Sequence, residues 1–183
     1  LGLKHPFESD GNNTVVLEPN EDRTIHTAMS YDDYSFSFDG TFRALDWMAL
    51  TKLYGVNALY AAGNDTYKFN DTEGVFVIDG AGIDHIDCKG SAFNIFIDLR
   101  PGSHSYEGER ENFITSPRQL TISNGSDIEN VSTGPGDDII IGNDLDNVIN
   151  TANGSDIIFA GNGADIVVPG FGDDFIDLSE DIP

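Results

Sequence analysis

Acidic and amide side chains recur at a fixed spacing near the end of the chain. When residues are counted in nines from Thr133, the sixth position of successive nonapeptides is Asp138, Asn147, Asp156, Asp165 and Asp174. Carboxylate and amide oxygens are hard ligands of the kind that Ca²⁺ binds at coordination numbers of six to eight. Such a row therefore predicts binding of a divalent cation, provided that the fold stacks these side chains.

Two other positions of the nonapeptide predict that fold. The fourth position is glycine in every copy but the second, which has Leu145. The eighth position is always aliphatic: Ile140, Ile149, Ile158, Val167 and Ile176. Six residues with glycine can form a tight turn in which backbone carbonyls converge, and three residues then form a short strand whose central side chain points into a core. Two nonapeptides complete one coil, as in the G-G-x-G-x-D-x-U-x repeats of RTX proteins, so we expect a calcium-binding parallel β-roll over residues 133–178.

This stacking predicts which side chains share an ion. Asp138, Asp156 and Asp174 follow one another at intervals of 18 residues, so Asp156 should share one ion with Asp138 and another with Asp174. Asn147 and Asp165 form the corresponding pair on the opposite edge.

The second nonapeptide, GNDLDNVIN, departs most from the pattern, so its site should be the weakest. A flexible linker rich in Gly and Asp is the alternative interpretation of this region. A linker, however, has no reason to keep an aliphatic residue at every ninth position through five repeats.

The residues before the repeats predict a helix followed by short strands. Residues 41–55, TFRALDWMALTKLYG, place apolar side chains at a helical spacing, and Gly55 stands where a C-terminal cap belongs. Alternating segments separated by Gly, Asn and Asp then predict an antiparallel β region over residues 56–132. Its expected strands are 66–70, 75–78 and 93–99. The fold class is therefore mainly β, and carboxylates at 78–87 and 127–129 favour a further ion site beside the roll.

Composition limits the classes of partner. The chain of 183 residues has 9 basic and 32 acidic side chains, for a net charge of −23, which disfavours binding to nucleic acid or anionic lipid. No segment approaches 18 consecutive apolar residues, so no membrane span is expected. Cys88 is the single cysteine and is interpreted as a small buried side chain. His26, His85 and His104 show no spacing typical of metal ligands and are interpreted as ordinary histidines.

Three motifs occur in a recognisable order ahead of the β region and the repeats. They are LGLKHP at 1–6, MSY at 29–31 and ALDWMALTKLYG at 44–55. In this order the chain resembles the serralysin family, the secreted bacterial RTX zinc metalloproteases of the metzincin clan. The metzincin signature is H-E-x-x-H-x-x-G-x-x-H followed by a Met-turn. Gly2 and His5 match the end of that signature, and Met29 matches the Met-turn.

The resemblance implies a zinc site of which this sequence carries only part. His5 resembles the third zinc ligand, and Tyr31 resembles the tyrosine that binds zinc at rest and can hydrogen-bond the oxyanion. The Glu and the first two His of the signature are not in the chain, and Asp32 stands where an aromatic residue commonly follows MSY. We therefore expect the chain alone not to hydrolyse peptides, and we expect it to be a piece of a longer protease that carries one Zn²⁺.

The resemblance also implies calcium sites ahead of the roll. One ion is expected between the turn at 63–65 and the carboxylates Asp79 and Asp84, and a second between Gly82, Asp84, Asp127 and Glu129. The full set of expected calcium ligands is Ala61, Gly63, Asp65, Asp79, Ala81, Gly82, Asp84, Asp127, Glu129, Gly134, Gly136, Asp138, Asn143, Leu145, Asn147, Thr151, Ala152, Asn153, Gly154, Asp156, Ala160, Asn162, Asp165, Pro169, Phe171 and Asp174. Without calcium these carboxylates repel one another, so the roll should lose its order.

The expected organisation follows from these observations. Residues 1–40 are interpreted as a remnant of a zinc-protease domain, 41–55 as a connecting helix, 56–132 as the β region, 133–178 as the roll and 179–183 as a tail. The family implies export from Gram-negative bacteria in one step, folding on extracellular calcium, and protein or peptide substrates for the complete enzyme. The missing N-terminal half of the protease is a further expected partner. The alternative is a non-catalytic RTX module of a toxin, lipase or adhesin, but such a module has no reason to contain His5, the MSY motif or the helix.

Overall fold

The computed structural model describes residues 44–179, and the chain falls into two units, residues 1–55 and 56–183. The first unit contributes one described helix, α1 (Ala44–Tyr54), with Asp46 in its first turn and Lys52 in its last, which suits the helix dipole. Gly55 has a φ of 75° and donates its N–H to the Thr51 carbonyl at 2.8 Å, so it caps the helix. Among the described residues, no helix is both long and apolar enough to cross a lipid bilayer.

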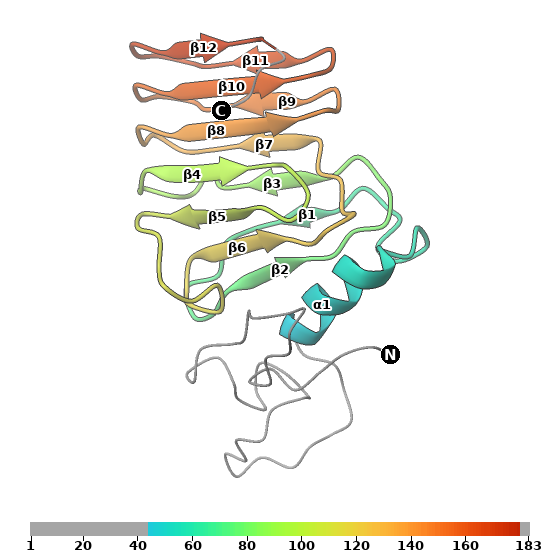
Figure 1. Cartoon of the computed structure of the whole chain (residues 1–183). Coiled ribbons are helices and arrows are strands. Elements are labelled where there is room, and N and C mark those ends of the chain that lie inside the picture. Colours follow the sequence, from blue (N-terminus) through green and yellow to red (C-terminus); the bar gives the residue numbers. More distant parts are fainter. Residues whose placement is uncertain (1–43, 180–183) are drawn as a thin grey trace, which may run out of the picture. The chain divides into compact units, whose positions relative to one another are not determined.

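Two sheets make up the second unit (Figure 1). One sheet has the order β1-β3-β7-β9-β11, with strands β1 (Thr66–Tyr67), β3 (His85–Asp87), β7 (Asn130–Ser132), β9 (Val148–Asn150) and β11 (Ile166–Val168). The other has the order β12-β10-β8-β4-β5-β6-β2, with strands β2 (Val75–Val77), β4 (Ile95–Asp98), β5 (His104–Glu107), β6 (Gln119–Ile122), β8 (Ile139–Asn143), β10 (Ile157–Gly161) and β12 (Phe175–Asp177). The chain passes from one sheet to the other at each turn of the repeats.

The register of the repeat strands confirms the predicted β-roll. In the seven-stranded sheet, Ile157 pairs in parallel with Ile139 on one side and with Phe175 on the other. In the five-stranded sheet, Val148 pairs in parallel with Ile166. Each of these partners is 18 residues away, so two nonapeptides complete one coil.

The β region before the repeats is less antiparallel than the sequence indicated. Only β5 pairs antiparallel, with β4 and with β6. The other strands pair in parallel: β1 with β3, β3 with β7, β4 with β8 and β2 with β6. The roll therefore begins well before Thr133. Its early coils carry long insertions, so His85 pairs with Asn130 across 45 residues, and this hides the period from sequence analysis.

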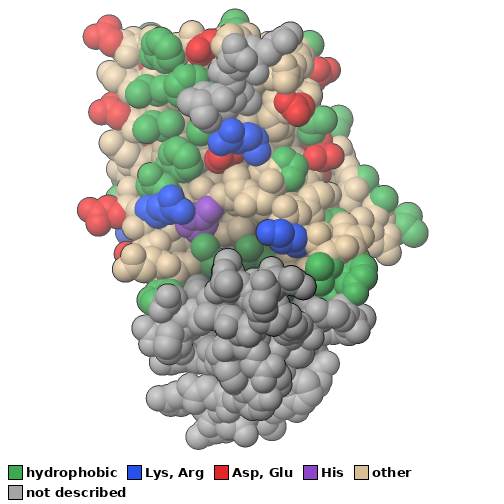
Figure 2. All heavy atoms as spheres, in the orientation of Figure 1, with side chains coloured by type: hydrophobic (Ala, Val, Ile, Leu, Met, Phe, Trp, Pro, Cys, Tyr) green, Lys and Arg blue, Asp and Glu red, His purple; other side chains and the backbone are tan. Residues whose placement is uncertain are grey.

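The core lies between the two sheets. The central side chains of the short strands fill it, and at most 1% of the surface of each is exposed: Ile86, Val131 and Ile149 from one sheet, and Ile97, Ile140 and Ile158 from the other. Ile139 and Ile157, which directly precede two of these central positions, are exposed on the outer face, whereas Ile141 on the other side of Ile140 is buried. Figure 2 shows acidic side chains along the edges of the roll and hydrophobic side chains between them. The strands thus hold the carboxylate-bearing turns in two stacked columns.

Candidate calcium sites along the edges of the roll

On one edge of the roll, each aspartate of the repeats reaches back to the preceding coil. The Oδ1 atom of Asp174 accepts a hydrogen bond from the backbone N–H of Asp156 at 3.0 Å. The Oδ1 atom of Asp156 accepts from the N–H of Asp138 at 2.9 Å, and that of Asp138 accepts from the N–H of Ile95 at 2.8 Å. These bonds place one carboxylate in each gap between stacked turns.

The second carboxylate oxygen of Asp138 and of Asp156, and that of Asp84 in an earlier turn, is buried and has no protein partner in the described part of the chain. Among the described residues, the Oδ2 atoms of Asp138, Asp156 and Asp84 have no hydrogen-bond partner, and each residue is at most 1% exposed. Burial raises the pKa of Asp138 and of Asp84 to about 6, and it raises the pKa of Asp156 as well. An unpartnered buried carboxylate oxygen is costly, and a bound cation removes that cost. These atoms therefore fit calcium ions.

The glycines of the turns bring backbone carbonyls to the same gaps. Gly154 and Gly172 have φ values of 142° and 148°, a conformation that side chains rarely allow. A Cβ atom at Gly154 would also collide with the carbonyl oxygen of Gly136, and one at Gly172 with the carbonyl oxygen of Gly154. The carbonyls of successive turns thus stack beside Asp138 and Asp156, where they can complete an oxygen cage.

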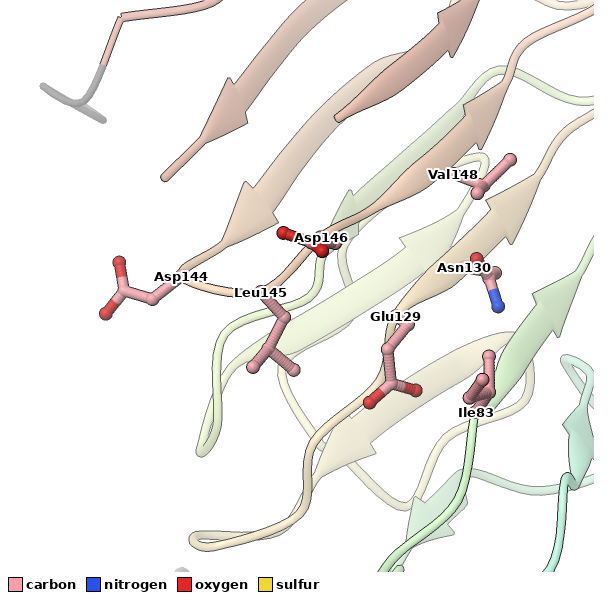
Figure 3. A pocket seen from close by; sticks show the side chains of 7 residues that line it. All are labelled: Ile83, Glu129, Asn130, Asp144, Leu145, Asp146 and Val148. Atoms are coloured by element: carbon pink, nitrogen blue, oxygen red, sulfur yellow. The ribbon is translucent and has the colours of Figure 1, made fainter. Parts of the chain in front are cut away.

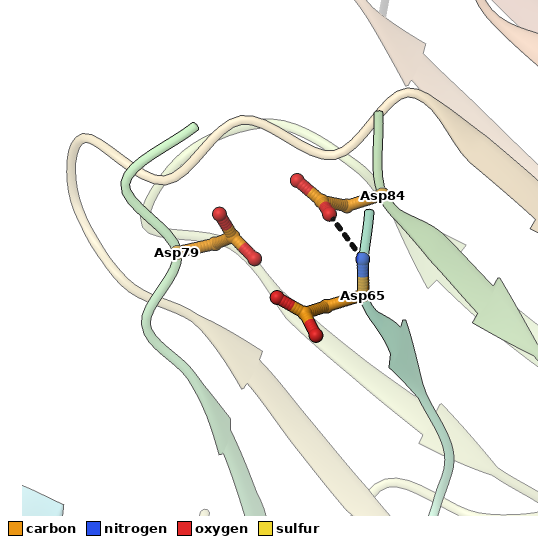
Figure 4. Close-up of side chains that lie close together, drawn as sticks. All are labelled: Asp65, Asp79 and Asp84. Atoms are coloured by element: carbon orange, nitrogen blue, oxygen red, sulfur yellow. Dashed lines mark hydrogen bonds between the residues drawn. The ribbon is translucent and has the colours of Figure 1, made fainter. Parts of the chain in front are cut away.

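The opposite edge carries a second column, made of Asp65, Asp84 and Glu129. The N–H of Asp65 donates to Oδ1 of Asp84 at 2.7 Å, and the N–H of Asp84 donates to Oε2 of Glu129 at 2.7 Å. One carboxylate oxygen each of Asp65, Asp79 and Asp84 lie within 4.8 Å of one another, and Figure 4 shows the three side chains converging. The predicted ligands of the first site are therefore brought together.

Asp79 is held in this cluster by neighbours that sequence analysis missed. The Tyr67 hydroxyl donates to Oδ2 of Asp79 at 2.6 Å, and the backbone N–H of Asp79 donates to Oγ of the buried Ser126 at 2.8 Å. Burial, together with the Asp79 carboxylate, raises the pKa of the Tyr67 hydroxyl. A tyrosine at the end of a two-residue strand gave no signal in the sequence of a role beside the ion.

The predicted second site is only partly assembled. Asp84 and Glu129 meet. Gly82 instead lies against the turn of the first site, because a Cβ atom at Gly82 would collide with the Gly63 carbonyl. Asp127 is exposed, on the turn before Glu129. Beside Glu129 lies an open pocket of about 530 Å³, shown in Figure 3. Its lining residues are Ile83, Glu129, Asn130, Asp144, Leu145, Asp146 and Val148.

Farther along this edge, the N–H of Asn147 donates to Oδ1 of Asp165 at 2.9 Å, so this predicted pair also lies in adjacent coils. Burial raises the pKa of Asp165. The other expected ligands of the roll lie in or next to its turns: Gly134, Asn143, Thr151, Ala152, Asn153, Ala160, Asn162, Pro169 and Phe171. Ala61 and Ala81 lie in the turns ahead of the roll.

A second row of polar side chains on the turns was also missed by sequence analysis. Oδ1 of Asp137 accepts from the N–H of Ser155 at 2.8 Å, and Oδ1 of Asp146 accepts from the N–H of Ala164 at 2.7 Å. These aspartates occupy the fifth position of the nonapeptide and reach forward by one coil, opposite in direction to the sixth. The fifth position gave only a weak signal in the sequence, because one coil after Asp137 and Asp146 it is occupied by Ser155 and Ala164.

The predicted zinc residues His5 and Tyr31, with Met29, lie outside the described residues, as does most of the expected tail at 179–183.

Comparison with known proteins agrees with the calcium-site geometry. Residues 123–144 and 141–176 match the family described as the RTX calcium-binding nonapeptide repeat in four copies. The chain thus carries RTX calcium-binding repeats, and the match begins before Thr133, as the early start of the roll does.

Similarity to curated proteins extends well beyond the repeats. Serralysin from Proteus mirabilis is 32% identical over 174 residues, which covers 81% of this chain and 34% of that protein. This chain is homologous to the C-terminal region of the serralysins. Serralysin G from Dickeya chrysanthemi is 32% identical over 172 residues, with 81% of the chain and 35% of that protein covered. Metallopeptidase AprA from Pseudomonas marginalis is 36% identical over 118 residues, with 57% and 24% covered. The serralysin-like chain spans about a third of the length of the first two relatives.

Proposed function

We propose that this chain is the calcium-binding part of a secreted zinc-dependent metalloendopeptidase, and that calcium binding drives its folding. The observation that carries the proposal is the extent of the similarity. The RTX match covers residues 123–176, whereas the serralysin from Proteus mirabilis matches 81% of the chain. A repeat module shared by unrelated proteins would account for the first match alone.

The calcium sites of the proposal are the gaps between stacked turns. In the roll, Asp138 with Asp156, Asp156 with Asp174 and Asn147 with Asp165 each enclose one ion. Ahead of it, Asp65, Asp79 and Asp84 bind one ion, and Asp84 with Asp127 and Glu129 binds another. The buried, unpartnered Oδ2 atoms of Asp84, Asp138 and Asp156 support these assignments directly. Each ion would neutralise carboxylates that otherwise repel one another, so folding and binding are coupled.

In the complete enzyme, His5 and Tyr31 would be zinc ligands, and the remaining ligands would come from residues that precede this chain. When bound, zinc lowers the pKa of a coordinated water and polarises the scissile carbonyl. Tyr31 would hydrogen-bond the oxyanion. The same resemblance supports export from a Gram-negative cell and folding in extracellular calcium, whose millimolar concentration suits weak sites.

The second candidate is a non-catalytic RTX module of another secreted protein, such as a toxin, lipase or adhesin. The RTX match over residues 123–176 favours it equally. The two candidates differ in what residues 1–55 do. In the protease they hold a zinc ligand and the helix α1 that leads into the roll, and in a plain module they have no metal-binding role.

The test compares this chain with a longer protein that restores the preceding HExxH segment. We expect the 183-residue chain to bind several calcium ions and to have no peptidase activity, and the longer protein to bind one zinc ion and cleave peptides. Replacing His5 by Ala in the longer protein should abolish zinc binding, while the control His26→Ala should not. Peptidase activity in the pure 183-residue chain would overturn the proposal, and a longer protein that binds no zinc and cleaves no peptide would favour the second candidate.

A further inference from the structure

We propose that one gap in the column of Asp65, Asp84 and Glu129 is closed by side-chain amides in place of a calcium ion. The gap lies between the turns 124–129 and 142–147, which are adjacent because β7 pairs with β9 in parallel. The amides are those of Asn143 and Asn147. The inference rests on the proposed calcium-binding function, and it concerns a gap to which no ion is assigned above.

Asn147 places side-chain N–H groups in this gap. In the preceding gaps of the same column, Asp84 and Glu129 place a carboxylate. Asn147 is fully buried, and its Nδ2 donates to the Glu129 carbonyl at 3.0 Å and to Oδ1 of Asn143 at 3.0 Å. Its own Oδ1 accepts from the N–H of Asn143 at 3.0 Å. All three polar groups of the side chain therefore have partners.

Asn143 extends the network to both sheets. It is 4% exposed, and its Nδ2 donates to the Leu99 carbonyl at 3.2 Å and to the Ile128 carbonyl at 2.8 Å. Leu99 follows β4 of the seven-stranded sheet, and Ile128 precedes β7 of the five-stranded sheet. The Oδ1 atom of Asn143 also accepts from the N–H of Leu145 at 3.0 Å. The two amides thus form a link between the sheets.

An ion is not needed in this gap. The four side-chain N–H bonds of the two amides all point to oxygens, and an N–H group cannot coordinate a cation. The Glu129 carbonyl is already bound twice, by Nδ2 of Asn147 and by the backbone N–H of Val148. The carboxylate gaps differ, because there the Oδ2 atoms of Asp84, Asp138 and Asp156 are left without a partner. The column is therefore interrupted at Asn147 by a link that does not depend on calcium.

The decisive variant is Asn147→Asp, which keeps the shape of the side chain and exchanges the NH₂ group for an oxygen. At saturating calcium it should bind one more ion per chain than the parent protein, by native mass spectrometry and calorimetric titration. An unchanged ion count would overturn the inference.

The matched control is Asn70→Asp. The Oδ1 atom of Asn70 accepts from the N–H and the hydroxyl of Thr72, and aspartate keeps both bonds, so neither readout should change. A second comparison tests the alternative that the added carboxylate only strengthens calcium binding in the neighbouring gap, between Asn147 and Asp165. Asn147→Asp introduced into Asp165→Asn should still add one ion relative to Asp165→Asn alone, and no gain in that background would count against the amide link.

If Asn147→Asp does not fold, hydrogen exchange in the protein without substitutions tests the amide link. In the ¹⁵N-labelled, calcium-loaded chain, the side-chain amide protons of Asn143 and Asn147 should exchange slowly with solvent. Rapid exchange of the Asn147 protons would overturn the inference. A chain that binds no calcium at all but keeps these protons protected would instead refute the proposed function and leave the amide link standing.

Discussion

Asp84, Asp138 and Asp156 share one local arrangement, in which a carboxylate gives one oxygen to a backbone N–H and leaves the other buried without a partner. The nonapeptide spacing predicted which of the repeat aspartates stack. It did not predict that each reaches back to the preceding turn, because spacing fixes the Cα positions and not the direction of the side chain. Nor did it predict that Asn147 would turn an amide N–H into its gap, since aspartate and asparagine fit the repeat equally.

Replacing Asp156 by Asn should reduce calcium binding more than any other single change on its edge, because Asp156 belongs to two proposed sites. We expect at least one ion fewer per chain. At calcium about 100-fold above the dissociation constant, each lost ion removes about 2.7 kcal/mol from the free energy of unfolding. The calcium-dependent rise in melting temperature measures this loss. The control Asp173→Asn removes an exposed neighbouring carboxylate and should leave the rise intact; an equal effect of both changes would mean that only net charge matters.

Acidification should stabilise the calcium-free roll. Burial raises the pKa of Asp84 and Asp138 to about 6 in the folded chain, above about 3.9 for an unfolded aspartate. The folded state therefore binds protons more tightly, so stability rises as the pH falls from about 6 to about 4. Far-ultraviolet circular dichroism at a series of pH values, after removal of calcium on a chelating resin, measures the β structure that acidification restores. A loss of β structure between pH 7 and pH 5 would contradict the assignment of these carboxylates as buried and unpaired.

At the scale of elements, the sequence predicted the strands that follow the strict nine-residue period. The strands β8 to β12 repeat every nine residues with an aliphatic centre, so their register followed from counting. The coils before them obey the same geometry, but the insertion that carries β4, β5 and β6 separates His85 from its partner Asn130. An insertion of that length removes the periodic signal while leaving the stacking intact. The short alternating segments were therefore interpreted as antiparallel.

In one turn of the roll, an alanine adopts the left-handed backbone conformation that normally favours glycine. Ala152 has a φ of 65°, whereas Gly170, at the same position one coil later, has a φ of 84° without a side chain. Replacing Ala152 by Gly should raise the free energy of unfolding by about 1 kcal/mol, because the left-handed conformation costs alanine about that much. Chemical denaturation in saturating calcium measures the change.

Ala164→Gly is the matched control for that change, because Ala164 lies in a turn on the other edge and does not have a positive φ. Here glycine should lower the free energy of unfolding by about 0.4–1 kcal/mol, since it adds freedom only to the unfolded chain. Destabilisation of similar size by both substitutions would show that Ala152 is not strained.

For the whole molecule, the net charge of −23 makes the folded state dependent on counterions. Apart from Asn147, the side chains assigned to the ions are carboxylates on the two edges of one roll, so their repulsion acts along the full stack when calcium is absent. The reactivity of the Cys88 thiol measures whether the roll stays folded when calcium is absent. Cys88 is 6% exposed, and burial raises the pKa of its thiol to about 12. It should therefore resist a thiol reagent at neutral pH in calcium and react many-fold faster after calcium is removed. Equal rates in both conditions would show that the roll around Cys88 keeps its fold without calcium.

The most direct test is a calcium titration of the calcium-free chain, followed at once by far-ultraviolet circular dichroism and by the amount of calcium bound per chain. A roll held together by ions between its coils predicts that several calcium ions bind and that β structure appears over the same range of concentration. Full β structure before the first ion binds, or less than one calcium ion per folded chain at millimolar calcium, would contradict it.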